Sequence, residues 1–345
     1  MQSIDFTHRR SHSTPLLGTI HPRINLSNAP EIFSFYDRTS ELSTLKQWIV
    51  KDHCRLITLF GLSGIGKTAL TVQLIPQIQA EFDYIIWRSL NPAPPLELLQ
   101  TNILQFLSRD DRPLSLPESL PIDRSLIILD DLQNIFASGQ LASHYQPGYE
   151  NYGTFFKQIA TSSHQSCFIL LSWEKPREFA SLEGKNQPCK SLQIEGLGEQ
   201  AGELLREKGL LETENWSQLI DLYQGNPLWL KIVASTIQEL FQGRVDTFLK
   251  YEPLYLGEEL ASILSQHFHR LSELEKQVIT CISHEVTPLA IPQLLETTQL
   301  SLSQLFNVLQ SLQRRSLIEI EEVDPEIRLS VKPVVKQYVR THFPQ

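Results

Sequence analysis

The stretch Arg55-Leu-Ile-Thr-Leu-Phe-Gly-Leu-Ser-Gly-Ile-Gly-Lys-Thr68 determines how the rest of the chain is interpreted. Residues 55–60 are rich in apolar, β-favouring side chains, which predicts a short buried strand. Residues 61–68 match the pattern G-x-x-x-x-G-K-[ST], and a helical pattern opens at Lys67. A strand, a glycine-rich loop and a helix in this order predict a loop that wraps the phosphates of a nucleotide.

Each residue type in this loop has a physical role. Glycines let main-chain N–H groups converge on phosphate oxygens, and the helix N-terminus adds its partial positive charge. We expect Lys67 to reach the β- and γ-phosphates and act in catalysis, and the hydroxyl of Thr68 to bind Mg²⁺. The residues expected to bind the nucleotide here are Gly61, Ser63, Gly64, Ile65, Gly66, Lys67, Thr68 and Ala69.

A pair of aspartates follows a second apolar run, Leu126-Ile-Ile-Leu-Asp-Asp131. Ligands of parallel sheets bind at the carboxyl ends of the strands. Asp130 is therefore a candidate ligand of Mg²⁺, and Asp131 is a candidate for the residue that orients or deprotonates the attacking water. A turn built from two adjacent aspartates is the structural alternative.

Apolar runs of strand length alternate with helical patterns through the first half of the chain. The further runs are residues 84–89, 125–129, 166–171 and 191–195. This alternation predicts an α/β domain whose parallel sheet carries helices on both faces.

Helical periodicity replaces the strands after about Gly196. From about Leu271, three helical patterns precede two β-like runs at 317–321 and 327–331, which is the order of a winged helix. We expect four parts, namely a flexible leader at 1–30, a nucleotide-binding domain at 31–197, a small helical domain at 198–268 and a winged-helix domain at 269–345.

Composition narrows the class of protein. The 345 residues carry 30 Lys and Arg against 39 Asp and Glu, a net charge of −9, which argues against a chain that coats nucleic acid or an anionic membrane. The four cysteines lack C-x-x-C spacing, so reduced thiols are expected rather than a zinc site or disulfides. No apolar run approaches the roughly 18 residues of a membrane span, and no secretory signal is visible. These features predict a cytoplasmic protein.

Several ordered motifs make the sequence resemble the NB-ARC branch of the STAND signalling ATPases, the class of the plant resistance proteins and the apoptosome scaffold. It most resembles bacterial, cyanobacterial-type members that often carry WD repeats downstream. The resemblance spans residues 31–343. Its motifs are Phe35-Tyr-Asp-Arg38, the phosphate loop, Phe82–Ser89, the aspartate pair, Gln146-Pro-Gly-Tyr149 and Gly225-Asn-Pro-Leu228.

The resemblance implies a binding site for ADP or ATP with Mg²⁺. Phe35, Tyr36 and Arg38 would border the adenine and ribose, and Pro227 would pack against the base from the helical domain. A proline at a helix start has the same appearance, and this is the alternative for Pro227.

Three positions depart from the family pattern. Asp37 stands where a glycine is usual before the arginine. Trp173 stands where members often carry an arginine that contacts the γ-phosphate, and an indole cannot neutralise phosphoryl charge. The family's methionine–histidine–aspartate motif aligns with Val331-Lys-Pro333, where Lys332 is the candidate for contact with a β-phosphate. A solvated surface lysine is the alternative.

The leading hypothesis is a signalling switch in which ADP holds the three modules closed. Exchange for ATP and Mg²⁺ would release the winged helix and favour self-association, and an unknown protein partner would supply the sensor or effector. Because Trp173 replaces the arginine, we expect slow or negligible hydrolysis. The first alternative is a remodelling ATPase of the AAA+ kind with true turnover.

The second alternative is a winged-helix transcription regulator under nucleotide control. The predicted helix at 302–313 is followed by Arg314 and Arg315, a candidate phosphate contact. Five acidic residues surround the predicted wing and would repel a duplex, so a solvated helix end is the expected role of both arginines and nucleic acid is not the expected partner. For His267, His269 and His284 we expect positions on the surface or at helix edges rather than a metal site.

Overall fold

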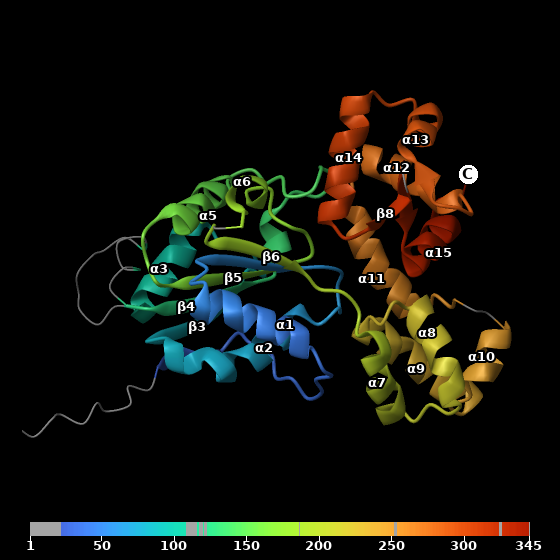
Figure 1. Ribbon diagram of the computed structural model, residues 1–345, viewed down its shortest axis with the longest axis horizontal. Helices are drawn as coiled ribbons and strands as arrows, with labels where there is room; N and C mark the ends of the chain where they lie inside the picture. Colours follow the sequence, from blue (N-terminus) through green and yellow to red (C-terminus); the bar gives the residue numbers. More distant parts are fainter. Residues whose placement is uncertain are drawn as a thin grey trace, which may run out of the picture.

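The computed structural model describes residues 22–107, 116, 120, 123–185, 187–251, 254–323 and 326–344. Residues 1–21 of the expected leader, most of the proline-rich stretch 112–121 and Asp324 lie outside these residues. Figure 1 shows an α/β domain joined to a mostly helical C-terminal half, in which α11 (Glu258–His269) runs from one group of helices to the other.

Six parallel strands form the sheet of the α/β domain, in the order β1-β3-β4-β5-β2-β6. They are β1 (Arg23–Asn25), β2 (Leu56–Phe60), β3 (Tyr84–Ser89), β4 (Ser125–Asp130), β5 (Cys167–Ser172) and β6 (Cys189–Gln193). Every residue of β2 and β5 is buried, because the sheet is covered on both faces. The predicted α/β fold is confirmed.

Two groups of helices cover the two faces of the sheet (Figure 1). The first group is α1 (Thr39–Lys46), which continues as a π-helical turn at Gln47–Lys51, and α2 (Lys67–Ile78). The other group is α3 (Leu96–Leu107), α5 (Asn151–Thr161) and the short α6 (Phe179–Leu182). Each face has its own apolar cluster, one around Leu74 and Trp87 and the other around Tyr152 and Phe168.

The strand β1 corrects the predicted leader. Arg23–Asn25 pair in parallel with Tyr84, Ile85 and Ile86 of β3, so this segment belongs to the edge of the sheet. The leader therefore ends before residue 23. The sequence offers little signal here, because three residues are too few to show a period of two.

The C-terminal half begins with a group of helices. They are α7 (Ala201–Glu207), α8 (Trp216–Leu222), α9 (Pro227–Phe241), α10 (Val245–Tyr251) and α11 (Glu258–His269). None of the helices among the described residues is long and apolar enough to cross a membrane.

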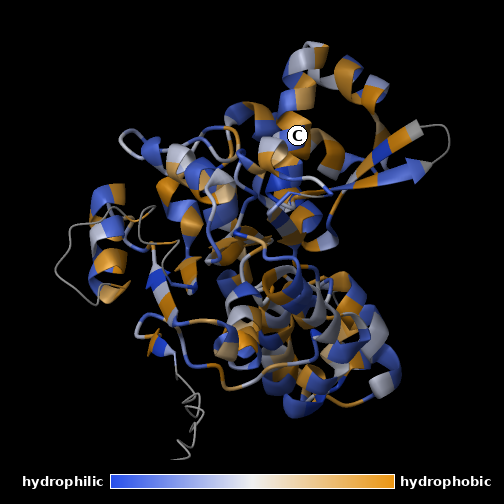
Figure 2. Cartoon of the chain, turned by 60° about the vertical axis from the view of Figure 1, so that its left-hand side comes forward, coloured by the Kyte–Doolittle hydropathy of each residue, from blue (hydrophilic) through white to orange (hydrophobic). Residues whose placement is uncertain are grey.

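The last part of the chain has the order that the sequence predicts for a winged helix. Its elements are α12 (Glu273–His284), β7 (Leu289–Ala290), α13 (Ile291–Thr298), α14 (Leu302–Arg314), β8 (Ile318–Val323), β9 (Glu326–Val331) and α15 (Pro333–His342). The strands form an antiparallel sheet in the order β7-β9-β8. The hairpin of β8 and β9 projects from the molecule, with hydrophilic and hydrophobic residues alternating along it (Figure 2).

The buried apolar side chains of the C-terminal half form one continuous cluster. It runs from Leu197 to Val339 and also takes in Tyr36 and Leu62 of the α/β domain. Helix α11 joins the two groups of helices, since the ring of Phe268 lies 4.8 Å from that of Tyr338 in α15. The helical and C-terminal groups therefore share one core, although the sequence suggests two separate modules.

Candidate functional site

The phosphate loop connects β2 to α2 and depends on glycine at three places. Gly61, Gly64 and Gly66 have φ angles of 146°, 75° and 108°, which side chains rarely adopt. A Cβ atom at Gly64 would also lie 2.3 Å from the Cβ of Leu228 in α9. The loop can therefore wrap tightly and at the same time accept close contact from the C-terminal half.

Lys67 lies buried at the first turn of α2. Its Nζ donates to the carbonyl oxygens of Gly61 at 2.8 Å and Leu62 at 3.0 Å, which holds the cation against the loop. Burial lowers the pKa of Lys67 to about 8, and the charges of Asp130 and Asp131 oppose this shift. Among the described residues, no carboxylate forms an ion pair with Lys67, so its charge remains available for a phosphate.

The predicted metal ligands lie together. The hydroxyl of Thr68 donates to Oδ2 of Asp130 at 3.2 Å, at the carboxyl end of β4. Burial and the neighbouring Asp131 raise the pKa of Asp130 to about 6. A hydroxyl and a carboxylate fit Mg²⁺, which is commonly held by few protein ligands and completes its shell with water and phosphate oxygens. No group of three or more His, Cys, Asp or Glu that could hold a metal occurs in the described part of the chain.

Asp131 is held in place by two neighbours. Its Oδ2 accepts from the hydroxyl of Ser89 at 3.0 Å, and its Oδ1 accepts from the amide of Gln133 at 3.1 Å. These two bonds orient the carboxylate. The proposed role of Asp131 toward water stays a prediction.

Two adjoining cavities lie on either side of the loop. The phosphate cavity, of about 350 Å³, is lined by Ser63, Lys67, Thr68, Asp130, Asp131 and Trp173 among others. The base cavity, of about 300 Å³, is lined by Phe35, Tyr36, Arg38, Pro227 and Lys231 among others. Ile32, Gly64, Gly66 and Ala69 line both cavities, so the two form the polar and apolar parts of one nucleotide-sized site.

The arginine motif adopts the required backbone without its glycine. Asp37 and Arg38 have φ angles of 46° and 72°. The carboxylate of Asp37 accepts from the main-chain N–H of Thr39 at 3.2 Å and from its hydroxyl at 2.7 Å, a local bond that helps Asp tolerate this conformation. Arg38 donates to the carbonyl oxygen of Ile65 at 2.9 Å and pairs with Glu41 at 2.7 Å. Asp37 therefore replaces the usual glycine without displacing the arginine.

The start of α9 contacts the phosphate loop directly. The Oδ1 of Asn226 accepts from the main-chain N–H groups of Leu228 at 3.1 Å and Trp229 at 3.4 Å, which caps the helix. The Nδ2 of the same side chain donates to the carbonyl oxygen of Ser63 at 3.1 Å. Pro227 begins the helix and lines the base cavity as the resemblance implies. Sequence reasoning noted the motif but missed the contact of Asn226 with the loop.

His267 is not at the surface, so that expectation is wrong. Its side chain is buried in α11, its Nε2 accepts from the main-chain N–H of Ser63 at 3.2 Å, and its ring centroid lies 4.3 Å from that of Trp173. Burial lowers the pKa of His267 to about 3, with the cations Lys67, Arg270 and Arg315 contributing. The signal in the sequence is periodicity, because Leu260, Leu264 and His267 follow at i, i+4 and i+7 and so share the inner face of the helix.

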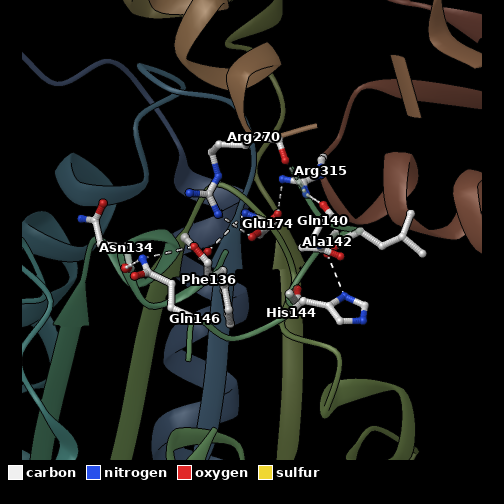
Figure 3. A network of polar contacts seen from close by, with 12 residues as sticks. Asn134, Phe136, Gln140, Ala142, His144, Gln146, Glu174, Arg270 and Arg315 are labelled. Atoms are coloured by element: carbon white, nitrogen blue, oxygen red, sulfur yellow. Dashed lines mark hydrogen bonds and ion pairs between the residues drawn. The ribbon is translucent and has the colours of Figure 1, made fainter. Parts of the chain in front are cut away.

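Arg315 is also buried, which contradicts the expected solvated helix end. Its Nη1 lies 2.5 Å from Oε2 of Glu174, and its Nε lies 3.0 Å from Oε1 of Glu275. Arg270 pairs with the other carboxylate oxygen of Glu174 at 2.9 Å. Figure 3 shows Glu174 beside both arginines. Two arginines and two glutamates thus form a balanced buried cluster between the α/β domain and the C-terminal half.

Lys332 does not contact the phosphate loop. Its Nζ lies 3.1 Å from Oε2 of Glu195, which follows β6, and the side chain is 8% exposed. Lys332 is thus not the solvated surface lysine of the alternative interpretation. It lies between β9 and α15, which place it against the edge of the six-stranded sheet. The expected contact of Lys332 with a β-phosphate stays a prediction, and in this arrangement of the modules the side chain is paired with Glu195 instead.

The chain is similar to a known domain family and to a known bacterial protein. Residues 38–137 match the NB-ARC domain family, which confirms the resemblance deduced from the motifs. The chain is 39% identical to an uncharacterized WD repeat-containing protein of Nostoc sp. (strain PCC 7120), over an alignment 358 positions long. The alignment covers 96% of this chain and 28% of that protein. The chain thus spans little more than a quarter of this relative.

Two solved structures resemble the chain more distantly. A STAND protein with a tetratricopeptide repeat sensor from Pyrococcus horikoshii is 18% identical with a TM-score of 0.44, over 95% of this chain and 44% of that one. The Cdc6p of Pyrobaculum aerophilum is 15% identical with a TM-score of 0.39, over 91% of this chain and 94% of that one.

Proposed function

We propose, from the NB-ARC domain at residues 38–137, that this chain is a signalling switch that binds ADP or ATP with Mg²⁺ and closes around the nucleotide. One observation carries the proposal. The site at the phosphate loop is bordered both by the α/β domain and by α9 and α11 of the C-terminal half. A nucleotide bound there favours whichever arrangement of the modules gives it more contacts.

Each part of the site has a role toward the nucleotide. The main-chain N–H groups of the loop and the cation of Lys67 bind the phosphates, while Thr68 and Asp130 hold Mg²⁺. Tyr36 and Pro227 lie in the base cavity, where their rings suit a planar purine. Arg38 supports the loop through Ile65 rather than through the phosphates.

We propose that hydrolysis is slow or negligible. Lys67 is the only cationic side chain among the described residues that line the phosphate cavity. By the family resemblance, Trp173 replaces an arginine that would stabilise the transferring phosphoryl group. Asp131 is the candidate base. Regulation then depends on which nucleotide is bound rather than on turnover.

We propose that the ATP state releases the C-terminal half and promotes self-association. A protein partner or segment would supply the sensor, which the name of the WD repeat-containing relative favours because that protein extends well beyond the aligned part. A cytoplasmic location agrees with this role.

The test is to identify the nucleotide that copurifies with the chain and to measure ADP and ATP binding by calorimetry with Mg²⁺ present. Lys67→Ala should lose the copurifying nucleotide and weaken binding at least 100-fold, because it removes the cation held over the loop. Lys51→Ala, which removes an exposed lysine, is the control and should bind normally. A wild-type chain that binds neither nucleotide would refute the proposal, and steady hydrolysis near one turnover per second would refute slow hydrolysis.

A further inference from the structure

One main-chain N–H of the phosphate loop already has a partner in the C-terminal half. Ser63 N donates to Nε2 of His267 at 3.2 Å, and the imidazole is 5% exposed. A main-chain amide carries a single hydrogen. Ser63 therefore donates fully either to this imidazole or to a phosphate oxygen, and the two acceptors compete.

The imidazole is an acceptor at this contact. It is held neutral, because burial and the neighbouring cations Lys67, Arg270 and Arg315 oppose its protonation. A neutral ring that accepts at Nε2 carries its hydrogen on Nδ1. Nε2 therefore presents a lone pair toward the loop. Because this nitrogen carries no hydrogen, it cannot donate a hydrogen bond to an oxyanion that approaches Ser63.

Trp173 fixes the position of this imidazole. Its ring centroid lies 4.3 Å from that of His267 at an interplanar angle of 32°, and it lines the phosphate cavity with Thr68 and Asp130. Thr68 and Asp130 would hold Mg²⁺, which would neutralise phosphate charge on this side of the cavity, so a third phosphate would bind beside Trp173. The ring pair offers that phosphate no cation there.

We propose that His267, stacked on Trp173, makes the closed arrangement selective for a nucleoside diphosphate over a triphosphate. This inference rests on the proposed function and assigns its discrimination to a residue of α11. A third phosphate gains the Ser63 N–H only by displacing the imidazole. A diphosphate leaves the contact intact.

The same displacement reaches the buried ion cluster. His267 lies one turn before Arg270 in α11, and Trp173 directly precedes Glu174 in the chain. Arg270 pairs with Glu174 at 2.9 Å. A shift of α11 that takes the imidazole away from Ser63 would also move Arg270 relative to Glu174, which would couple discrimination to opening.

The test compares two nucleotides on three variants of the full chain. Calorimetry with Mg²⁺ gives the dissociation constants of ADP and of a non-hydrolysable ATP analogue. In His267→Ala the ratio of the analogue's constant to that of ADP should fall about tenfold, equivalent to about 1.4 kcal/mol. His267→Gln keeps a neutral acceptor and should retain most of the wild-type ratio. His269→Ala changes an exposed residue of the same chain segment and should leave the ratio unchanged.

Thermal unfolding without nucleotide separates discrimination from damage to the fold. A purely structural role for His267 would lower the melting temperature and weaken both nucleotides equally, which overturns the inference. An unchanged ratio in His267→Ala, or an equal fall in His269→Ala, overturns it as well while leaving the proposed function intact. If the wild-type chain binds neither nucleotide, the proposed function fails and this inference fails with it.

Discussion

Two of the contacts between the C-terminal half and the α/β domain differ in chemistry. The loop contact consists of Asn226 and Leu228 of α9 against Ser63 and Gly64. The ionic contact consists of Glu174, Arg270, Glu275 and Arg315. The loop contact is uncharged: Leu228 packs closely against Gly64, and the amide of Asn226 donates to the carbonyl oxygen of Ser63 beside the nucleotide site. The ionic contact is charged and buried and lies beyond the end of β5.

Because the two contacts differ in this way, the two halves can dock in one defined arrangement and still separate at the phosphate loop. Buried charges tolerate few alternative pairings, so the ionic contact specifies how the halves dock. The loop contact depends on close approach, so it responds to anything that enters the phosphate cavity.

The largest effect is expected from Arg315→Ala. This change leaves Glu174 and Glu275 buried with less compensating charge, which should lower the free energy of unfolding by about 3–5 kcal/mol. Urea unfolding measures it. Lys276→Ala removes a surface pair with Glu273 and should cost at most about 1 kcal/mol. Equal losses in the two variants would contradict the assignment of a buried ionic contact.

Gly64→Ala should disrupt the loop contact. The added Cβ would meet the Cβ of Leu228 at 2.3 Å, which forces α9 away from the loop and costs about 1–3 kcal/mol on top of backbone strain. Gly148→Ala is the matched control, since its φ is +88° but nothing lies within 4 Å of its Cβ. The control should show only the strain, about 1–2 kcal/mol in urea unfolding. Small-angle scattering should show expansion for Gly64→Ala alone.

Asn226 separates two functions of one side chain. Asn226→Ala loses both the helix cap and the bond to Ser63 and should cost about 1–2 kcal/mol. Asn226→Asp keeps the capping oxygen but loses the Nδ2 donor, so it should retain the stability of α9 while loosening the loop contact. Amide exchange in the first turn of α9 and at Ser63 distinguishes the two. Loss of protection in α9 for both variants would contradict this division.

The smallest expected effect is a pH dependence from His267. Its pKa is lowered from 6.5 to about 3 in the folded chain, so between these values the unfolded chain binds a proton that the folded chain does not. Stability should therefore fall as pH drops below 6.5, by at most about 1.4 kcal/mol per unit. The measurement is the difference between wild type and His267→Gln at pH 7.0 and 5.5, in which other titrating groups cancel. A constant difference would contradict a buried neutral imidazole.

Local patterns predict most of the fold and of the phosphate site. The strand–loop–helix order around Lys67 and the strand end at Asp130 can each be read from neighbouring residues. The rule that ligands bind at the carboxyl ends of parallel strands then places Thr68 and Asp130 at the same edge of the sheet. The errors concern His267 and Arg315, whose partners lie in distant segments. Burial of a charged or titrating side chain depends on how whole modules dock, and no local period encodes that. Asp37 shows the reverse case, because its own side chain replaces the missing glycine.

The short first strand has a consequence for how the chain can be shortened. Arg23–Asn25 cover one edge of the sheet, where they pair with Tyr84, Ile85 and Ile86. A version that begins at residue 31 would leave the main-chain groups of this apolar edge open to pairing with other molecules. Such a version should aggregate even though the whole phosphate loop, Asp130 and Asp131 are present, and misassembly of this kind would imitate self-association. Studies of assembly therefore need the complete sheet, with residues 22–30 retained.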